Sequence, residues 1–194
     1  MPLPLPVPEI PRPPMLCTLL LSFFLEIVTV TATWNPGICN DKCGEMLGKA
    51  LNKNGAIQKI DLTSGKVVMY WKPNAPFNYQ TLKRNFQSVG VGLNLTPYEL
   101  KVRGTVFKQG GDVVLVSIGD NTRFNLIGPA PVSSNQYVSR GTIVNRKLQG
   151  ELLDQVELAM KNRAIVEVTG GLYLPETPPM RLAVNKLTIV NPEQ

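Results

Sequence analysis

The stretch that decides the fold is EIVTVTATWNPGICNDKCGEMLGKALNKNGAIQKIDL, residues 26–62. Residues 26–34 alternate between the two faces of the chain and are rich in β-branched side chains, which predicts a strand. Asn35-Pro36-Gly37 breaks that strand, and Asn40 or Asp41 is positioned to cap a helix that ends at Asn54-Gly55. We expect the apolar face of this helix to comprise Met46, Leu47, Ala50 and Leu51. A second strand is predicted over residues 56–62.

The alternation of short predicted strands and helices continues after residue 62. A tight turn at residues 63–66 leads to a strand at 67–71, a helix at 77–89 and a further strand near 93–102. The order strand, helix, hairpin, helix, strand is the ferredoxin-like βαββαβ arrangement. We therefore expect residues 25–97 to form a ferredoxin-like domain.

The second half of the chain, residues 98–194, has a different pattern. Three strands are predicted first, then an amphipathic helix with Leu152, Leu153, Val156 and Met160 facing inward, and finally two strands. The predicted ranges are 99–108, 113–118 and 122–127, then the helix at 149–162, then 164–168 and 182–190. This order is typical of a small OB-like β-barrel. The predicted fold class is thus α+β, a ferredoxin-like domain followed by an OB-like barrel.

The loop between the first strand and the first helix makes the prediction more specific. It reads Gly37-Ile38-Cys39-Asn40-Asp41-Lys42-Cys43. Residues 25–100 resemble the heavy-metal-associated domain of copper chaperones, metal-transporting ATPases and mercury-binding proteins, which carries Gly-Met-Thr-Cys-x-x-Cys in this loop. Cys43 matches the second cysteine of that family. Asn40 stands at the position of the first one, and Cys39 precedes it by one residue, so the spacing here is Cys-x-x-x-Cys.

The resemblance implies a non-enzymatic protein that binds and transfers a soft metal ion, Cu(I) or Hg(II), with Cys39 and Cys43 as ligands and a donor or acceptor protein as partner. Two thiolates suit such ions, and a chain without histidine cannot complete an ordinary zinc site. The first turn of a helix and Lys42 would favour a thiolate at Cys43. Two alternatives stay open for the cysteine pair: a disulfide or dithiol redox pair, and a degenerate domain with idle thiols. Met46 and Met69 are expected in the core.

The sequence of residues 1–24 is not typical of a folded domain. Seven of the 17 prolines lie in the first 14 residues, and the apolar run at 16–25 has the length of a signal-peptide core rather than of a membrane span. We expect an exported protein, periplasmic or secreted, with cytoplasmic location as the alternative and membrane contact only through this leader. Cleavage after Ala32 would remove the first strand, whereas cleavage near Ser22 would spare it. Cys17 lies inside the run, and no lipidation is expected there.

Composition excludes several classes of function. Without histidine there is no Ser-His-Asp triad and no Cys-His pair, and no nucleotide-binding or hydrolase motif occurs, so we expect no enzyme. The net charge of +6 is spread out, which suits an acidic protein partner more than nucleic acid. An OB-like barrel still raises single-stranded nucleic-acid binding as an alternative. Its candidate stacking residues are Phe107, Phe124, Tyr137 and Tyr173. A protein-interaction or structural module is the other alternative.

Overall fold

The computed structural model describes residues 27–34, 37, 41–90, 98–129 and 146–190. Over these residues the protein is α+β, with a mixed sheet of eight strands and three helices. In chain order the elements are β1 (Ile27–Thr33), α1 (Asp41–Asn52), β2 (Ile57–Thr63), β3 (Lys66–Trp71), α2 (Tyr79–Gln87), β4 (Tyr98–Gln109), β5 (Asp112–Ser117), β6 (Arg123–Ile127), α3 (Glu151–Asn162), β7 (Ile165–Tyr173) and β8 (Arg181–Val190).

The predicted helices and strands match these elements to within a few residues at most ends, and β7 extends further, to Tyr173. One difference has a clear local cause. The helix predicted from Phe77 begins at Tyr79, because the side chain of Asn78 accepts a hydrogen bond from the Thr81 N–H at 3.0 Å and so caps the helix one residue before its start. The beginning of the strand predicted near 93–102 lies outside the described residues, and β4 is described from Tyr98 onward.

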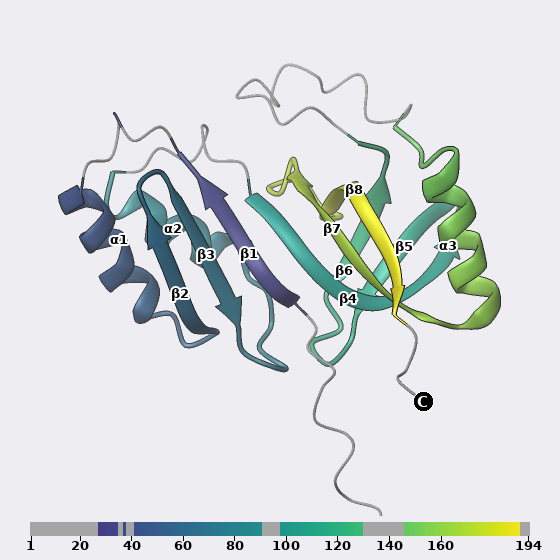
Figure 1. Cartoon of the computed structure of the whole chain (residues 1–194), viewed down its shortest axis with the longest axis horizontal. Coiled ribbons are helices and arrows are strands. Elements are labelled where there is room, and N and C mark those ends of the chain that lie inside the picture. The colour runs from purple at the N-terminus through teal and green to yellow at the C-terminus, as the bar shows by residue number, and fades with distance from the viewer. Residues whose placement is uncertain (1–26, 35–36, 38–40, 91–97, 130–145, 191–194) are drawn as a thin grey trace, which may run out of the picture.

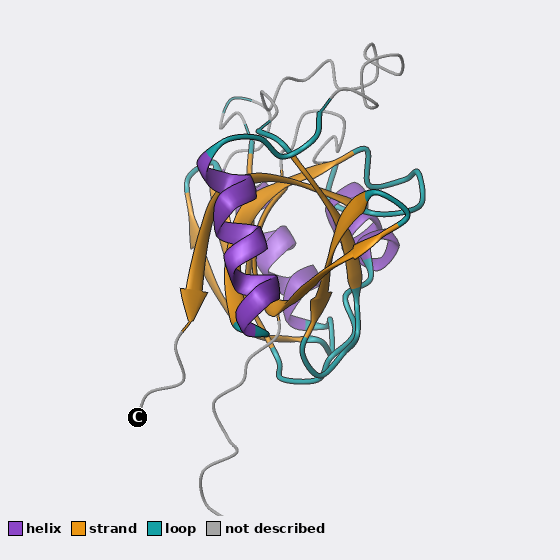
Figure 2. Ribbon diagram, turned by 90° about the vertical axis from the view of Figure 1, so that its right-hand side faces the viewer, coloured by secondary structure: helices purple, strands orange, loops and turns teal. Residues whose placement is uncertain are grey.

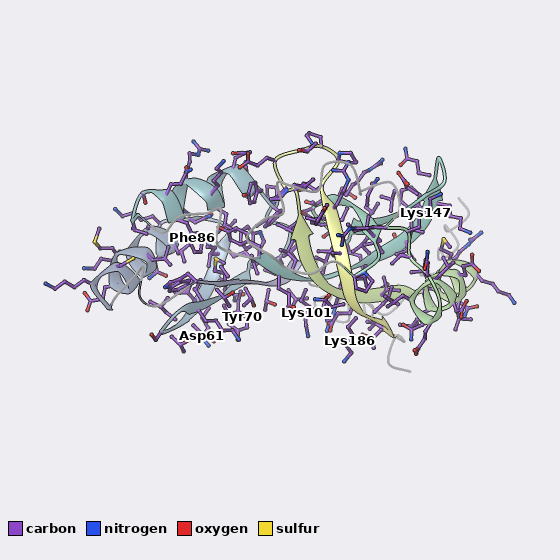
Figure 3. The ribbon with its side chains drawn as sticks, turned by 90° about the horizontal axis from the view of Figure 1, so that it is seen from above. Asp61, Tyr70, Phe86, Lys101, Lys147 and Lys186 are labelled. Carbon is purple, nitrogen blue, oxygen red and sulfur yellow. The ribbon has the colours of Figure 1, made fainter. Side chains whose placement is uncertain are left out.

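The first lobe is a sheet of four strands in the order β2-β3-β1-β4, with every neighbouring pair antiparallel. The first strand of the chain is central in this sheet, and its Val30 and Ala32 are fully buried. Both α1 and α2 lie on the same side of these strands (Figures 1 and 3). The cysteine-bearing end of α1 therefore belongs to the helical side of the lobe.

The second lobe closes on itself. The sheet continues from β4 to β5, β6, β8 and β7, and β7 pairs again with β4. Only the β6–β8 pairing is parallel among these described strands. Figure 2 shows the resulting ring of strands with α3 alongside it. The pairing of β7 with β4 joins what would otherwise be the two outer strands of an open sheet, which reduces the free strand edge.

Strand β4 belongs to both lobes and curves from one to the other (Figure 1). Residues 98–102 of β4 pair with β1, whereas residues 104–109 pair with β5. A Cβ atom at Gly104 would lie 2.2 Å from the carbonyl oxygen of Val116, on β5. The curl of β4 into the barrel therefore requires glycine at this position.

The two lobes share one hydrophobic core. Phe77, just before α2, stacks between Trp71 of the first lobe and Phe124 of the barrel, with ring centroids 5.5 and 6.2 Å apart. The Phe77 N–H also donates to the Asp120 carboxylate at 3.2 Å, and Lys83 of α2 pairs with Glu176 of the barrel. The predicted domain boundary lies between residues 97 and 98. Strand β4 begins directly after it and pairs in both lobes, and the hydrophobic core extends across both lobes.

The predicted apolar face of α1 is wrong at Met46. Its side chain is 53% exposed, whereas Leu47 and Leu51 are fully buried. Gly48 faces the sheet in its place, since a Cβ atom there would lie 3.6 Å from Ile60 of β2. Gly48 is buried, whereas Met46, two positions earlier on the helix, faces solvent. Met69, by contrast, is fully buried as predicted.

Candidate metal and thiol site

Cys43 is the third residue of α1, so it lies in the first helical turn, directly after the loop that follows β1. Its side chain is half-buried and packs against the hydrophobic core. The sulfur atom lies 3.7 Å from the carbonyl oxygen of Val89, just after α2. The other predicted ligand, Cys39, lies outside the described residues, as does Cys17.

Cys43 is disulfide-bonded in the structure. In this oxidised form the sulfur is not a thiolate and cannot act as one toward a metal ion. Any metal chemistry at Cys43 thus belongs to the reduced protein.

The surroundings of Cys43 add one feature that the sequence pattern concealed. Met46 follows Cys43 by three positions on α1, and residues at this spacing are neighbours on a helix. Because Met46 is exposed rather than buried, its thioether is accessible one turn away from the cysteine. Among the described residues no group of three or more His, Cys, Asp or Glu side chains is placed to hold a metal ion.

The aromatic residues proposed for nucleic-acid stacking are differently placed. Phe124 is fully buried and Tyr173 is 3% exposed, so neither offers a face to a base, and their prediction as stacking platforms is wrong. Both side chains point into apolar clusters of the barrel because they occupy the inward positions of β6 and β7. Phe107 is half-exposed, and Tyr137 lies outside the described residues.

The acidic residues of the barrel turns have structural partners. Asp120 accepts hydrogen bonds from the N–H groups of Phe77 and Thr122, at 3.2 and 3.3 Å. Asp112 accepts one from Asn125 at 3.1 Å. Through the Phe77 N–H, Asp120 also ties the barrel to the first lobe.

Glu167 of β7 forms an ion-pair cluster with two cations of β4. Its carboxylate lies 3.0 Å from Lys101 Nζ and 2.8 Å from Arg103 Nε, both on β4. Burial by itself would raise the pKa of Glu167, but the hydrogen bonds and charges of Lys101 and Arg103 outweigh it and lower that pKa below its ordinary value. Figure 3 shows Lys101 on the same side of the molecule as Asp61, Tyr70 and Lys186. This cluster stabilises the pairing of β4 with β7.

Comparison with known proteins gives no relative: no family model, curated protein or solved structure matches this chain. None of the described helices has the length and apolar character needed to span a bilayer.

Proposed function

We propose that this chain is a non-enzymatic soft-metal protein in which Cys39 and Cys43, once reduced, bind Cu(I) or a similar thiophilic ion and pass it to a partner protein. The observation that carries the proposal is the position of Cys43. It lies in the first turn of α1, after β1 of a sheet ordered β2-β3-β1-β4 with two helices on one side. The heavy-metal-associated domains that residues 25–100 resemble keep their ligands at this loop.

The finer fold description belongs to the same proposal. The antiparallel order β2-β3-β1-β4 supports a ferredoxin-like first domain. The ring β4-β5-β6-β8-β7, with α3 between β6 and β7 in the chain, supports an OB-like barrel. In this proposal a single strand, β4, serves as the last strand of the first domain and the first strand of the second.

Metal binding requires the disulfide at Cys43 to be opened. Reduction takes up two electrons and two protons and leaves two thiols, with a dithiol or a phosphine as the reductant. The two thiols release their protons to solvent as they bind the metal ion as thiolates. The N-terminal turn of α1 favours the thiolate of Cys43, because free N–H groups there stabilise negative charge. Transfer follows by exchange of one thiolate at a time for the thiolates of the acceptor.

A second candidate is a protein-interaction or structural module that binds no metal. The disulfide at Cys43 favours it, because an oxidised pair can simply join two segments of chain. A disulfide also supports our proposal of export to an oxidising compartment. Processing would then have to occur before Ile27, because β1 is the buried central strand of the first lobe. Mass spectrometry of the native N-terminus tests this, and a chain beginning after Ala32 would contradict it.

The deciding experiment is titration of the reduced, reductant-free chain with Cu(I) against a competing chromophoric chelator. We expect wild type to withdraw one equivalent of Cu(I), the Cys39→Ala/Cys43→Ala double variant to withdraw none, and Cys17→Ala to match wild type. The Cys17→Ala variant is the matched control, since it also removes a cysteine. Equal binding by wild type and the double variant would refute the metal proposal and leave the interaction module.

A further inference from the structure

A cavity of about 570 Å³ lies at the α3 end of the barrel. It is lined by residues of β4, β5, β6, the start of β8, α3 and the segment 146–148 that precedes α3, and it is partly open to solvent. Its volume is within the range of sites that hold small molecules. The proposed metal function does not involve this cavity.

One wall of the cavity is apolar. It is formed by side chains from β5, β6 and the region around α3, namely Val113, Leu126, Ile127, Leu148 and Leu153. Leu153 is half-buried, and the other four residues are 5–8% exposed, so the wall presents a small apolar surface to the cavity. That surface suits an apolar body of modest size, which it would remove from water.

The carboxylates at the cavity already have partners. Glu157 of α3 pairs with Lys108 Nζ at 3.0 Å, and Asp112 accepts a hydrogen bond from Asn125 Nδ2 at 3.1 Å. The Lys108–Glu157 pair cancels in charge, whereas Asn125 is neutral and leaves Asp112 its negative charge. The lining therefore keeps a net charge of +2, from Arg146, Lys147 and Arg181 against Asp112.

Three cations remain, and we call them the cationic rim: Arg146, Lys147 and Arg181. The described part of the chain gives none of them a carboxylate within ion-pair distance. Arg146 is held in place: its carbonyl accepts the Gly128 N–H at 2.8 Å, and its guanidinium lies 5.3 Å from the centre of the Tyr173 ring. Arg181 donates one N–H to a backbone carbonyl of the loop before β8 at 3.2 Å. The guanidinium groups of the rim are therefore largely positioned before any ligand binds.

We propose that this cavity binds a small amphiphilic anion, with an apolar body against the wall and a single carboxylate or sulfonate at the cationic rim. The apolar wall alone would accept a neutral ligand, and the rim alone would accept inorganic phosphate. Their combination around one cavity selects a molecule that has both parts. Binding here is independent of the cysteines and of any metal.

The test uses the full chain and three probes: 2-naphthoate, the neutral 2-naphthalenemethanol, and inorganic phosphate. Binding is followed by amide shifts in a ¹H–¹⁵N spectrum, with Gly111 and Leu148 as reporters at the cavity. The variant Lys147→Gln/Arg181→Gln removes two charges from the rim. The control Lys66→Gln/Lys186→Gln removes two exposed charges elsewhere, and Figure 3 shows Lys186 on the side of the molecule opposite Lys147.

We expect wild type and the control variant to bind 2-naphthoate saturably. The rim variant should bind 2-naphthoate at least about tenfold more weakly, because hydrogen bonds to charged groups carry that much affinity. For the same reason wild type should bind the neutral alcohol at least about tenfold more weakly than 2-naphthoate. Rising salt should weaken naphthoate binding to wild type, a measurement that needs no variant. Equal affinity for naphthoate and the alcohol would overturn the role of the rim. Equal affinity for naphthoate and phosphate would overturn the role of the wall. An unchanged rim variant would overturn the assignment of the site.

Discussion

The substitution Gly104→Ala tests whether the two lobes depend on the curvature of β4. A Cβ atom at this position would lie 2.2 Å from the Val116 carbonyl oxygen and 2.8 Å from its carbon. Relief would require β4 and β5 to separate by about 1 Å, to ordinary van der Waals distance. On its other edge Gly104 pairs with Val166 of β7, so β4 cannot retreat without disturbing that ladder too.

We expect this substitution to lower the free energy of unfolding by about 2–4 kcal/mol, the cost of overpacking plus that of one weakened ladder hydrogen bond. Urea unfolding measures it through the fluorescence of the buried Trp34 and Trp71. Gly55→Ala is the matched control. Gly55 is exposed, has no atom within 4 Å of its built Cβ and does not have a positive φ, so its effect should stay within about 0.5 kcal/mol of zero. Equal unfolding midpoints for the two variants would refute the reasoning.

Three further predictions concern the barrel. Gly170→Ala should also cost about 2–4 kcal/mol, because its Cβ would lie 2.3 Å from a carbonyl oxygen of β8; an unchanged urea midpoint would contradict this. The lowered pKa of Glu167 means that its ionised form stabilises the fold above the ordinary value of 4.5, and that this contribution is lost as the pH falls through the lower, folded value. Unfolding measured at a series of pH values should therefore show a shallower acid decline for Glu167→Gln than for wild type or Glu157→Gln, and parallel curves would argue against it. Ser117 is fully buried, and its hydroxyl has no hydrogen-bond partner within the described residues. Ser117→Ala should leave thermal stability unchanged or raise it by up to about 1 kcal/mol, and a clear loss would show that the hydroxyl has a partner.

The outcome for the first helix shows where sequence periodicity reaches its limit. The pattern located the helix and the burial of Leu47 and Leu51, but it assigned Met46 to the core. Periodicity records which residues are apolar, and it gives a glycine no weight. In the folded protein Gly48 is buried, facing β2, and the exposed Met46 becomes a candidate thioether beside Cys43.

The stacking residues show the same limit in the barrel. The sequence predicted Phe124 and Tyr173 as residues that stack on bases, since an aromatic side chain in a strand can lie on either face of a sheet. Closure of β7 onto β4 decides which face is interior, and it buries both residues. The cavity and its cationic rim could not be predicted either, because Lys147 and Arg181 come from segments more than thirty positions apart in the chain.

The sequence by itself determined the order of the helices and strands, because alternation, helical periodicity and turn residues act over a few neighbouring positions. It also determined that soft-metal chemistry, if present, must rely on sulfur, since the chain contains no histidine. Only the tertiary structure decided that the Cys43 sulfur is in a disulfide and that three cations without a carboxylate partner among the described residues line one cavity beside an apolar wall. The physical reason is that these features depend on contacts between distant segments, which exist only once the chain has packed.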